Sequence, residues 1–192
     1  MANSRLITLG LLAGAIAAGL SHLPRFGGGP WLASLSPQAR ADANWPNFLV
    51  VAGGGAPSYN EIALEKNVLY FQRTLAFMGL DQAPTDIFFA NGDSGEATIR
   101  YLDEQGREQF KVPDIPNLTG AATLRNVRRW LQAPPEQPAG ASDCPTFFYF
   151  TGHGLLNRRD SGNNTLILWE ESLVSVQQLA GWLDQWPAEN LL

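Results

Sequence analysis

One histidine stands where its side chain could do chemistry. His153 lies between Gly152 and Gly154, at the end of an apolar run. An imidazole takes up and releases protons near neutral pH and therefore suits general acid–base catalysis. The glycine after it can present a backbone N–H to a negative charge that develops on a reacting oxygen. The sequence thus indicates His153 and Gly154 as candidate catalytic residues. The alternative is a histidine that only caps the strand through local hydrogen bonds.

Two other short motifs carry weaker signals. Gly92-Asp93-Ser94-Gly95 has the letters of a serine-protease nucleophile sequence, but it precedes the histidine in an α/β pattern, so we interpret it as a tight turn. The glycines at 53–55 follow a predicted strand, as in a nucleotide-binding turn. They lack the G-x-G-x-x-G spacing, and a nucleotide-binding Rossmann-like or flavodoxin-like domain stays an alternative.

The single cysteine, Cys144, is a poor nucleophile for this histidine. It lies nine residues before His153, at the entry end of the same predicted strand. At about 3.3 Å per residue, that spacing puts the thiol far from the carboxyl end of the strand. One cysteine also excludes an internal disulfide and a cysteine-based zinc site. With only two histidines in the chain, we expect no metal or other cofactor.

The elements that must position His153 follow an alternating pattern. Apolar runs at 48–52, 87–90 and 147–150 predict buried strands, each followed by a glycine-rich or polar loop. Between the first two, Ser58 and Glu61 have capping-box spacing and predict a helix that continues to Met78 and ends at Gly79.

The remaining segments complete an α/β order. Residues 97–112 predict a surface hairpin, and Thr119 is expected to cap a second helix. A further strand is expected at 166–169, and the capping-box pair Ser175 and Gln178 predicts a last helix. This order favours a mostly parallel sheet with helices. Functional loops in such sheets meet beyond the carboxyl ends of the strands, where His153 would lie.

Composition and the N-terminus limit the class of protein. The 192 residues carry a net charge of −5 without a clustered basic face, so nucleic acid is not an expected partner. The arginines at 125, 128 and 129 are interpreted as the solvated side of a helix. Residues 1–43 contain Arg5, an apolar stretch at 6–20 and small-residue cleavage patterns, which predict a signal peptide or membrane anchor followed by a flexible segment. We therefore expect an exported protein, periplasmic or secreted.

Several of these features together resemble one peptidase family. The run from Phe147 to Gly154, the strand at 165–169, and the acidic turn and helix that follow to Leu183 resemble the legumain branch of the caspase, legumain and gingipain superfamily. The resemblance covers residues 46–192. It implies a caspase-like three-layer α/β sandwich around a mostly parallel sheet, with residues 44–192 as the N-terminal portion of a cysteine peptidase domain.

The resemblance also implies an activity and a site. The family hydrolyses peptide bonds of peptide or protein substrates through a Cys-His dyad, in which the histidine corresponds to His153 and an oxyanion donor to the amide of Gly154. The cysteine-bearing strand is expected beyond Leu192, so this chain alone is expected to be inactive. No arginine lies within 61–64, where legumain carries one, so the preferred substrate residue stays open. A catalytically inactive caspase-like binding module is the further alternative.

Overall fold

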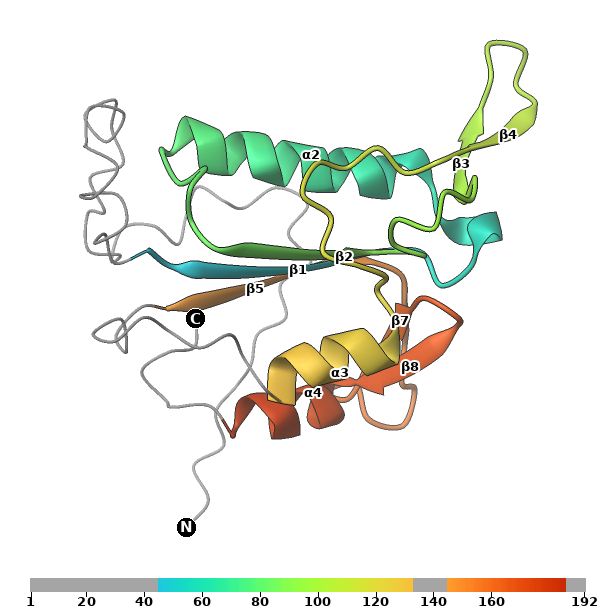
Figure 1. Cartoon of the computed structure of the whole chain (residues 1–192). Helices are drawn as coiled ribbons and strands as arrows, with labels where there is room; N and C mark the ends of the chain where they lie inside the picture. Colours follow the sequence, from blue (N-terminus) through green and yellow to red (C-terminus); the bar gives the residue numbers. More distant parts are fainter. Residues whose placement is uncertain (1–44, 133–144, 186–192) are drawn as a thin grey trace.

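The computed structural model describes residues 45–132 and 145–185, which form a parallel sheet covered by helices (Figure 1). The sheet has the strand order β2-β1-β5, built from β1 (Asn47–Gly53), β2 (Thr85–Phe89) and β5 (Thr146–Gly152). Both neighbours run parallel to β1. The expected mixed α/β class with a parallel sheet is therefore confirmed.

Helices cover both faces of this sheet. Helix α2 (Ile62–Phe77) lies on one face, and α3 (Leu124–Gln132) and α4 (Val176–Leu183) lie on the other (Figure 1). Alternate side chains of β1 enter the two cores: Val50 packs on the α2 side and Leu49 on the side of α3 and α4. Strand β1 is buried along its whole length, as expected for a central parallel strand.

The start of α2 differs from the predicted capping box. Ser58 lies in a short 3₁₀ helix, η3 (Pro57–Tyr59), and Glu61 is the N-cap residue of α2 without a side-chain capping bond. The structure thus overturns the Ser58–Glu61 cap, because the Glu61 carboxylate is directed to other partners.

Two other predicted helix ends are confirmed. Gly79 adopts a φ of 74° after α2, and its N–H donates to the oxygen of Ala76 at 3.0 Å. Glycine takes this left-handed conformation without a steric penalty. Ser175 and Gln178 form both bonds of a capping box at the start of α4.

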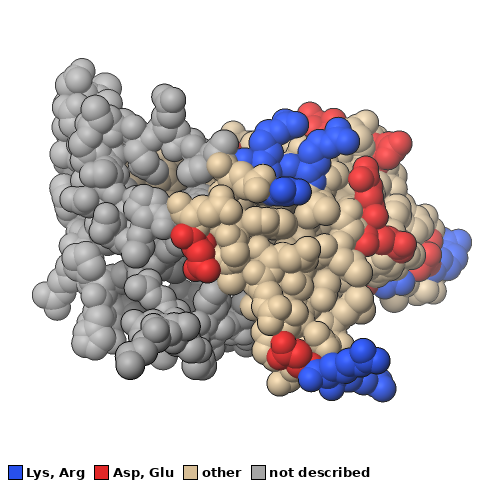
Figure 2. Space-filling model, turned by 90° about the horizontal axis from the view of Figure 1, so that it is seen from below, with Lys and Arg blue, Asp and Glu red and all other residues tan. Residues whose placement is uncertain are grey.

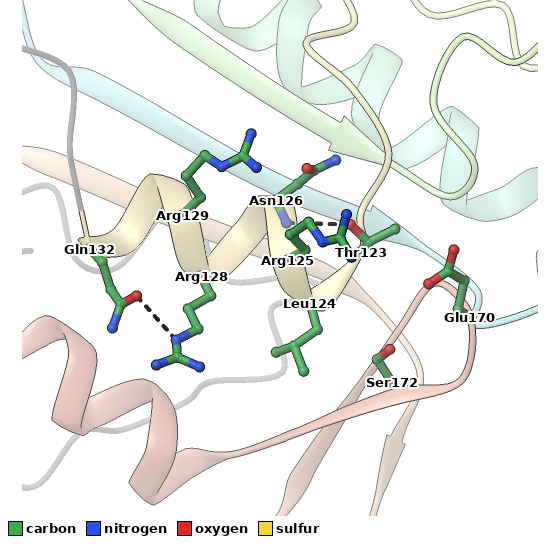
Figure 3. A pocket seen from close by; sticks show the side chains of 9 residues that line it. All are labelled: Thr123, Leu124, Arg125, Asn126, Arg128, Arg129, Gln132, Glu170 and Ser172. Carbon is green, nitrogen blue, oxygen red and sulfur yellow. Dashed lines mark hydrogen bonds between the residues drawn. The ribbon is translucent and has the colours of Figure 1, made fainter.

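The second helix begins later than expected. The Thr119 hydroxyl accepts a hydrogen bond from the Ile87 N–H at 2.9 Å, so it ties a loop to β2 instead of capping α3. The Thr123 hydroxyl accepts from the Asn126 N–H at 3.3 Å and occupies the capping position (Figure 3). The predicted Thr119 cap is therefore wrong, and the capping residue is Thr123.

Strand β5 is less buried than its aromatic sequence predicted. Only Thr146 is buried, and the other six residues are half-buried. The reason is position: within the described part of the chain β5 stands at the end of the sheet, with β1 on one side and no strand on the other. Its side chains still pack alternately against both cores, with Phe148 and Phe150 toward α3 and α4.

The chain after His153 forms a separate antiparallel sheet, which the sequence did not predict. Its order is β6-β7-β8, made of β6 (Gly154–Leu155), β7 (Thr165–Leu168) and β8 (Ser172–Ser175). Only residues 169–171 connect β7 to β8, and so short a connection permits antiparallel pairing alone. The predicted hairpin is confirmed as β3 (Ile99–Leu102) and β4 (Glu108–Lys111) (Figure 1).

Several expectations lie outside the described residues: the N-terminal segment 1–43, Cys144, and the expected strand start at 191–192. Among residues 45–132 and 145–185, no helix is long and apolar enough to cross a membrane.

Candidate functional site

The carboxyl ends of the parallel strands meet at one edge of the sheet. Gly53 pairs with Gly152 across β1 and β5, and Ala52 pairs with Phe89 across β1 and β2. His153 follows Gly152 directly, so its backbone leaves the sheet beside the glycine turn at 53–55. The sequence-based prediction that these loops share an edge is confirmed.

The imidazole of His153 is held by a carboxylate. Its Nε2 lies 2.8 Å from Oε2 of Glu61, and the His153 side chain keeps 41% of its surface exposed. An ionised carboxylate only accepts hydrogen bonds, so Nε2 carries the proton in this pair. In the neutral imidazole, Nδ1 is then the nitrogen with a free lone pair, and it can act as a base.

Glu61 also joins His153 to an arginine. Oε1 of Glu61 lies 3.0 Å from Nη2 of Arg100, and Nη1 of Arg100 lies 3.2 Å from Glu108. Burial raises the pKa of Glu61, but hydrogen bonds from His153, from the Glu61 backbone and from Arg100, together with the electrostatic attraction to His153, outweigh burial, so this pKa lies below its ordinary value. Glu61 is therefore ionised at neutral pH.

A tyrosine ring also contacts the imidazole. The ring of Tyr59 stands edge-on to the imidazole of His153, with centroids 5.8 Å apart. Its hydroxyl donates to Oε1 of Glu171 at 2.6 Å, and this bond, followed by slight burial, raises the pKa of Tyr59 above its ordinary value. Glu171 lies in the turn between β7 and β8, which links this hairpin to η3.

That turn is conformationally costly. Glu170 and Glu171 adopt φ angles of 64° and 53°, in the left-handed region that favours glycine. Each such residue costs about 1 kcal/mol. The Glu171 N–H donates to the oxygen of Gly55 at 3.1 Å, so the strained turn is held against the glycine turn by its backbone as well as by the Tyr59 bond.

A buried asparagine fixes the segment that carries Tyr59 and Glu61. Asn60 is completely buried, and its Oδ1 accepts from the Gly54 N–H at 2.9 Å. Its Nδ2 donates to the oxygen of Thr98 at 3.2 Å, and its own carbonyl accepts from the Arg100 N–H at 2.9 Å. Asn60, which directly precedes Glu61, thus connects the end of β1 to the start of β3.

The glycine turn at 53–55 is filled by protein. A Cβ at Gly54 would lie 2.0 Å from the carbonyl oxygen of Tyr59, and one at Gly55 would lie 2.6 Å from Cγ2 of Ile167. The Gly54 N–H is already bonded to Asn60. These glycines are therefore explained by close packing under η3 and β7, and the N–H of Gly54 is not available to a phosphate.

The two glycines beside His153 also lie close to neighbouring backbone. A Cβ at Gly152 would be 2.7 Å from the oxygen of Gly53, and one at Gly154 would be 2.8 Å from the oxygen of Thr165. Glycine is required at both positions, because any side chain there would collide with the neighbouring backbone.

A separate hollow of about 820 Å³ lies beside α3, and neither His153 nor Glu61 lines it (Figure 3). Arg125, Arg128 and Arg129 line it together with Glu170 of the β7–β8 turn. Nε of Arg128 donates to Gln132 at 3.1 Å. Figure 2, which views the molecule from below the sheet, shows Lys and Arg atoms in separate groups toward the edges of this face, with Asp and Glu atoms near them and a mostly uncharged surface between. The hollow is open and shares no residue with the His153 cluster, which we define as His153, Glu61, Tyr59, Arg100 and Glu171.

The other sequence candidates have structural explanations. The Ser94 hydroxyl accepts from the Glu96 N–H at 3.2 Å and contacts the Asn91 side chain, as in a tight turn. The turn interpretation of Gly92–Gly95 is confirmed, with φ angles of 69° and 76° at its two glycines. Within the described ranges, no group of three or more His, Cys, Asp or Glu side chains could hold a metal ion.

Sequence reasoning found the histidine and missed its partners. Glu61 was assigned to a helix cap, and Tyr59, Asn60 and Arg100 were not considered. Glu61 and His153 lie 92 positions apart, and no local pattern links residues at that separation. The burial of Asn60, which obliges its amide to find hydrogen-bond partners, is known only from the structure, so no signal in the sequence pointed to this residue.

Comparison of the chain with protein-family models, with curated proteins and with solved structures found no match.

Proposed function

We propose that this chain carries the histidine-bearing part of a cysteine endopeptidase of the caspase and legumain type. His153 is the general acid–base residue, the Gly154 N–H is an oxyanion donor, and the thiol comes from a segment outside the described residues. The observation that carries the proposal is the half-exposed imidazole at the carboxyl edge of a parallel sheet, with Nε2 fixed 2.8 Å from a carboxylate.

The fixed imidazole supports proton transfer in a defined direction. Because Glu61 occupies Nε2, Nδ1 is the nitrogen that can take the thiol proton as the thiolate attacks a peptide carbonyl. His153 then returns this proton to the leaving amine, and afterwards takes one from the water that cleaves the thioester. In this scheme Glu61 is a positioning residue, comparable to the carboxylate that orients the histidine of a catalytic triad.

The strand register supports the oxyanion role of Gly154. The Ile167 N–H donates to the His153 oxygen at 2.9 Å, and Gly154 pairs with Leu166. Antiparallel pairs alternate between hydrogen-bonded and non-hydrogen-bonded types, so Gly154 and Leu166 form a non-hydrogen-bonded pair. The N–H of Gly154 therefore points away from β7, on the free side of β6, where a substrate carbonyl could accept it.

The order of elements also supports this family. A parallel strand ends in His-Gly, an antiparallel hairpin with an acidic turn follows, and α4 packs back on the sheet. The three-layer caspase-like sandwich remains the finer proposal within the α/β class. The nucleotide-binding alternative is less well supported, because the Gly54 N–H is bonded to Asn60 and the space above Gly54 is occupied.

The test uses the natural protein at the full length that its gene encodes. A panel of fluorogenic peptides is assayed with and without a thiol-alkylating reagent. We expect hydrolysis that the reagent abolishes, and His153→Ala should lower kcat by at least about a hundredfold.

Cys144→Ser is the matched control and should retain activity. Activity that survives His153→Ala, or that Cys144→Ser removes, contradicts the proposal. Binding of the same peptides without any hydrolysis would instead support the inactive binding module.

We further propose that residues 1–43 direct export of the chain. N-terminal sequencing of the protein from the periplasmic and culture fractions tests this, with cleavage expected within the small residues of 39–43. Recovery of the protein only from the cytoplasm, with an intact N-terminus, contradicts it.

A further inference from the structure

Strand β6 begins immediately after His153 and has one free edge. It contains only Gly154 and Leu155, and it pairs with β7 alone in the described sheet order β6-β7-β8. Edge strands present unpaired N–H and C=O groups to any extended chain that approaches them. A two-residue edge is too short to join two copies of a folded domain by strand pairing, but it can hold a short peptide segment.

The backbone of Gly154 is directed to this free edge. Since Gly154 and Leu166 form a non-hydrogen-bonded pair, both the N–H and the C=O of Gly154 point away from β7. One residue of an antiparallel peptide could therefore exchange two hydrogen bonds with Gly154. The carbonyl of that residue would then lie next to the imidazole of His153.

The register also places side chains on the two faces of this small sheet. Gly154 is in one row with Leu166 and Val174, which are both buried. Successive residues of a strand alternate between faces, so His153 and Leu155 share the opposite face. The Leu155 side chain is 49% exposed there, two residues along from the imidazole. It provides an apolar surface beside the candidate catalytic group.

We propose that the free edge of β6 is the docking strand for an extended peptide substrate. One residue of the peptide pairs with the backbone of Gly154, and an apolar side chain of the peptide packs on Leu155. This inference rests on the proposed peptidase function for the identity of the ligand as a substrate. It adds a backbone-pairing site and a preference for an apolar residue near the scissile bond.

Peptide binding to the 192-residue chain tests the docking strand without requiring hydrolysis. The probes are the capped pentapeptide Ala-Ala-Leu-Ala-Ala, its counterpart with asparagine at the central position, and the leucine peptide with a methyl group on the amide nitrogen of the alanine that follows leucine. This alanine is the residue that pairs with Gly154 when leucine lies opposite Leu155. Backbone amide signals are followed by NMR. We expect the leucine peptide to shift the Gly154 signal, the asparagine peptide to bind about tenfold more weakly, and the methylated peptide to lose most of its affinity.

Two protein variants give a matched comparison. Leu155→Asn should weaken binding of the leucine peptide about tenfold, whereas Leu173→Asn should leave it within about twofold. Leu173 is 48% exposed on the same face but belongs to β8, which is separated from the proposed peptide by β6 and β7. Equal effects of the two variants, an unchanged Gly154 signal at saturation, or no binding at millimolar peptide would each overturn the docking strand.

The two proposals can fail separately. If the full-length protein binds peptides at Gly154 but hydrolyses none of them, the proposed peptidase function is contradicted and the docking strand is supported. If hydrolysis depends on His153 but Leu155→Asn does not change its KM, the docking strand is contradicted and the peptidase function is supported.

Discussion

Replacement of Asn60 by alanine tests how the His153 cluster is held together. The Asn60 side chain is completely buried and makes two hydrogen bonds to backbone groups, the Gly54 N–H at 2.9 Å and the Thr98 oxygen at 3.2 Å. Both partners belong to the buried interior. Alanine at position 60 removes the amide that bonds to both groups, and the surrounding buried atoms are too closely packed to supply other hydrogen-bond partners.

The expected destabilisation follows from these two bonds. A buried backbone group left without a partner costs about 1–3 kcal/mol. Two such groups in Asn60→Ala therefore cost about 2–6 kcal/mol, and we expect a value near the middle, about 4 kcal/mol. Total stabilities of small domains are about 5–15 kcal/mol, so this variant should keep only a part of its resistance to unfolding.

Urea unfolding followed by tryptophan fluorescence measures this difference between Asn60→Ala and the unmodified chain. Asn67→Ala is the matched control: the Asn67 side chain is exposed and makes one bond, at 2.9 Å to the Thr151 hydroxyl. We expect the control to lose at most about 1 kcal/mol. A loss below about 1 kcal/mol for Asn60→Ala, or equal losses for the two variants, would refute the reasoning that Asn60 fixes the segment before Glu61.

Three further predictions concern charged groups. Glu61→Gln should lower the free energy of unfolding at pH 7 by about 1 kcal/mol. Because folding lowers the pKa of Glu61, its ionised carboxylate stabilises the protein above the ordinary pKa, and this stabilisation is lost as the pH falls through the lowered pKa of the folded state. Urea titrations at several pH values should therefore show the difference between Glu61→Gln and the unmodified chain vanish in acid. Lys111→Met should lower the free energy of unfolding by about 3 kcal/mol, because it leaves the Glu65 carboxylate, which is only 4% exposed and lies 2.8 Å from Lys111, without its cation. Adding Glu65→Gln should restore most of this loss, and a double variant without recovery would contradict the prediction. Glu171→Gln should bring the raised pKa of Tyr59 down toward about 10 in an NMR titration of the ring carbons, and an unchanged Tyr59 titration would exclude the bond between these side chains in solution.

The elements of the fold were largely readable from the sequence. The strand at 48–52, the hairpin at 97–112 and the capping box at Ser175 were all predicted, because hydrophobic period and turn chemistry act within windows of a few residues. The position of His153 at a strand end came from the same local reasoning. Two helix caps were predicted at the wrong residues. Ser58 lies in a 3₁₀ turn, and the Thr119 hydroxyl accepts a hydrogen bond from the Ile87 N–H, so neither side chain caps a helix.

The segment after His153 shows where local reasoning stopped. The apolar run at 166–169 was identified as a strand, but its sequence does not say which sheet it joins. Short connections on both sides force it into antiparallel pairing with β6 and β8 instead of the parallel sheet. That pairing also sets the direction of the Gly154 N–H, on which the proposed oxyanion site depends.

By itself, then, the sequence determined the α/β class, the approximate strands and helices, and one imidazole at a loop edge. The tertiary structure alone decided that Glu61 holds this imidazole and that Arg100, from a hairpin 39 positions further on, lies on the other oxygen of the same carboxylate. The physical reason is that these contacts arise from sheet register and from the buried hydrogen bonds of Asn60, which bring distant segments to one edge. No periodicity in the chain records which distant side chains will meet there.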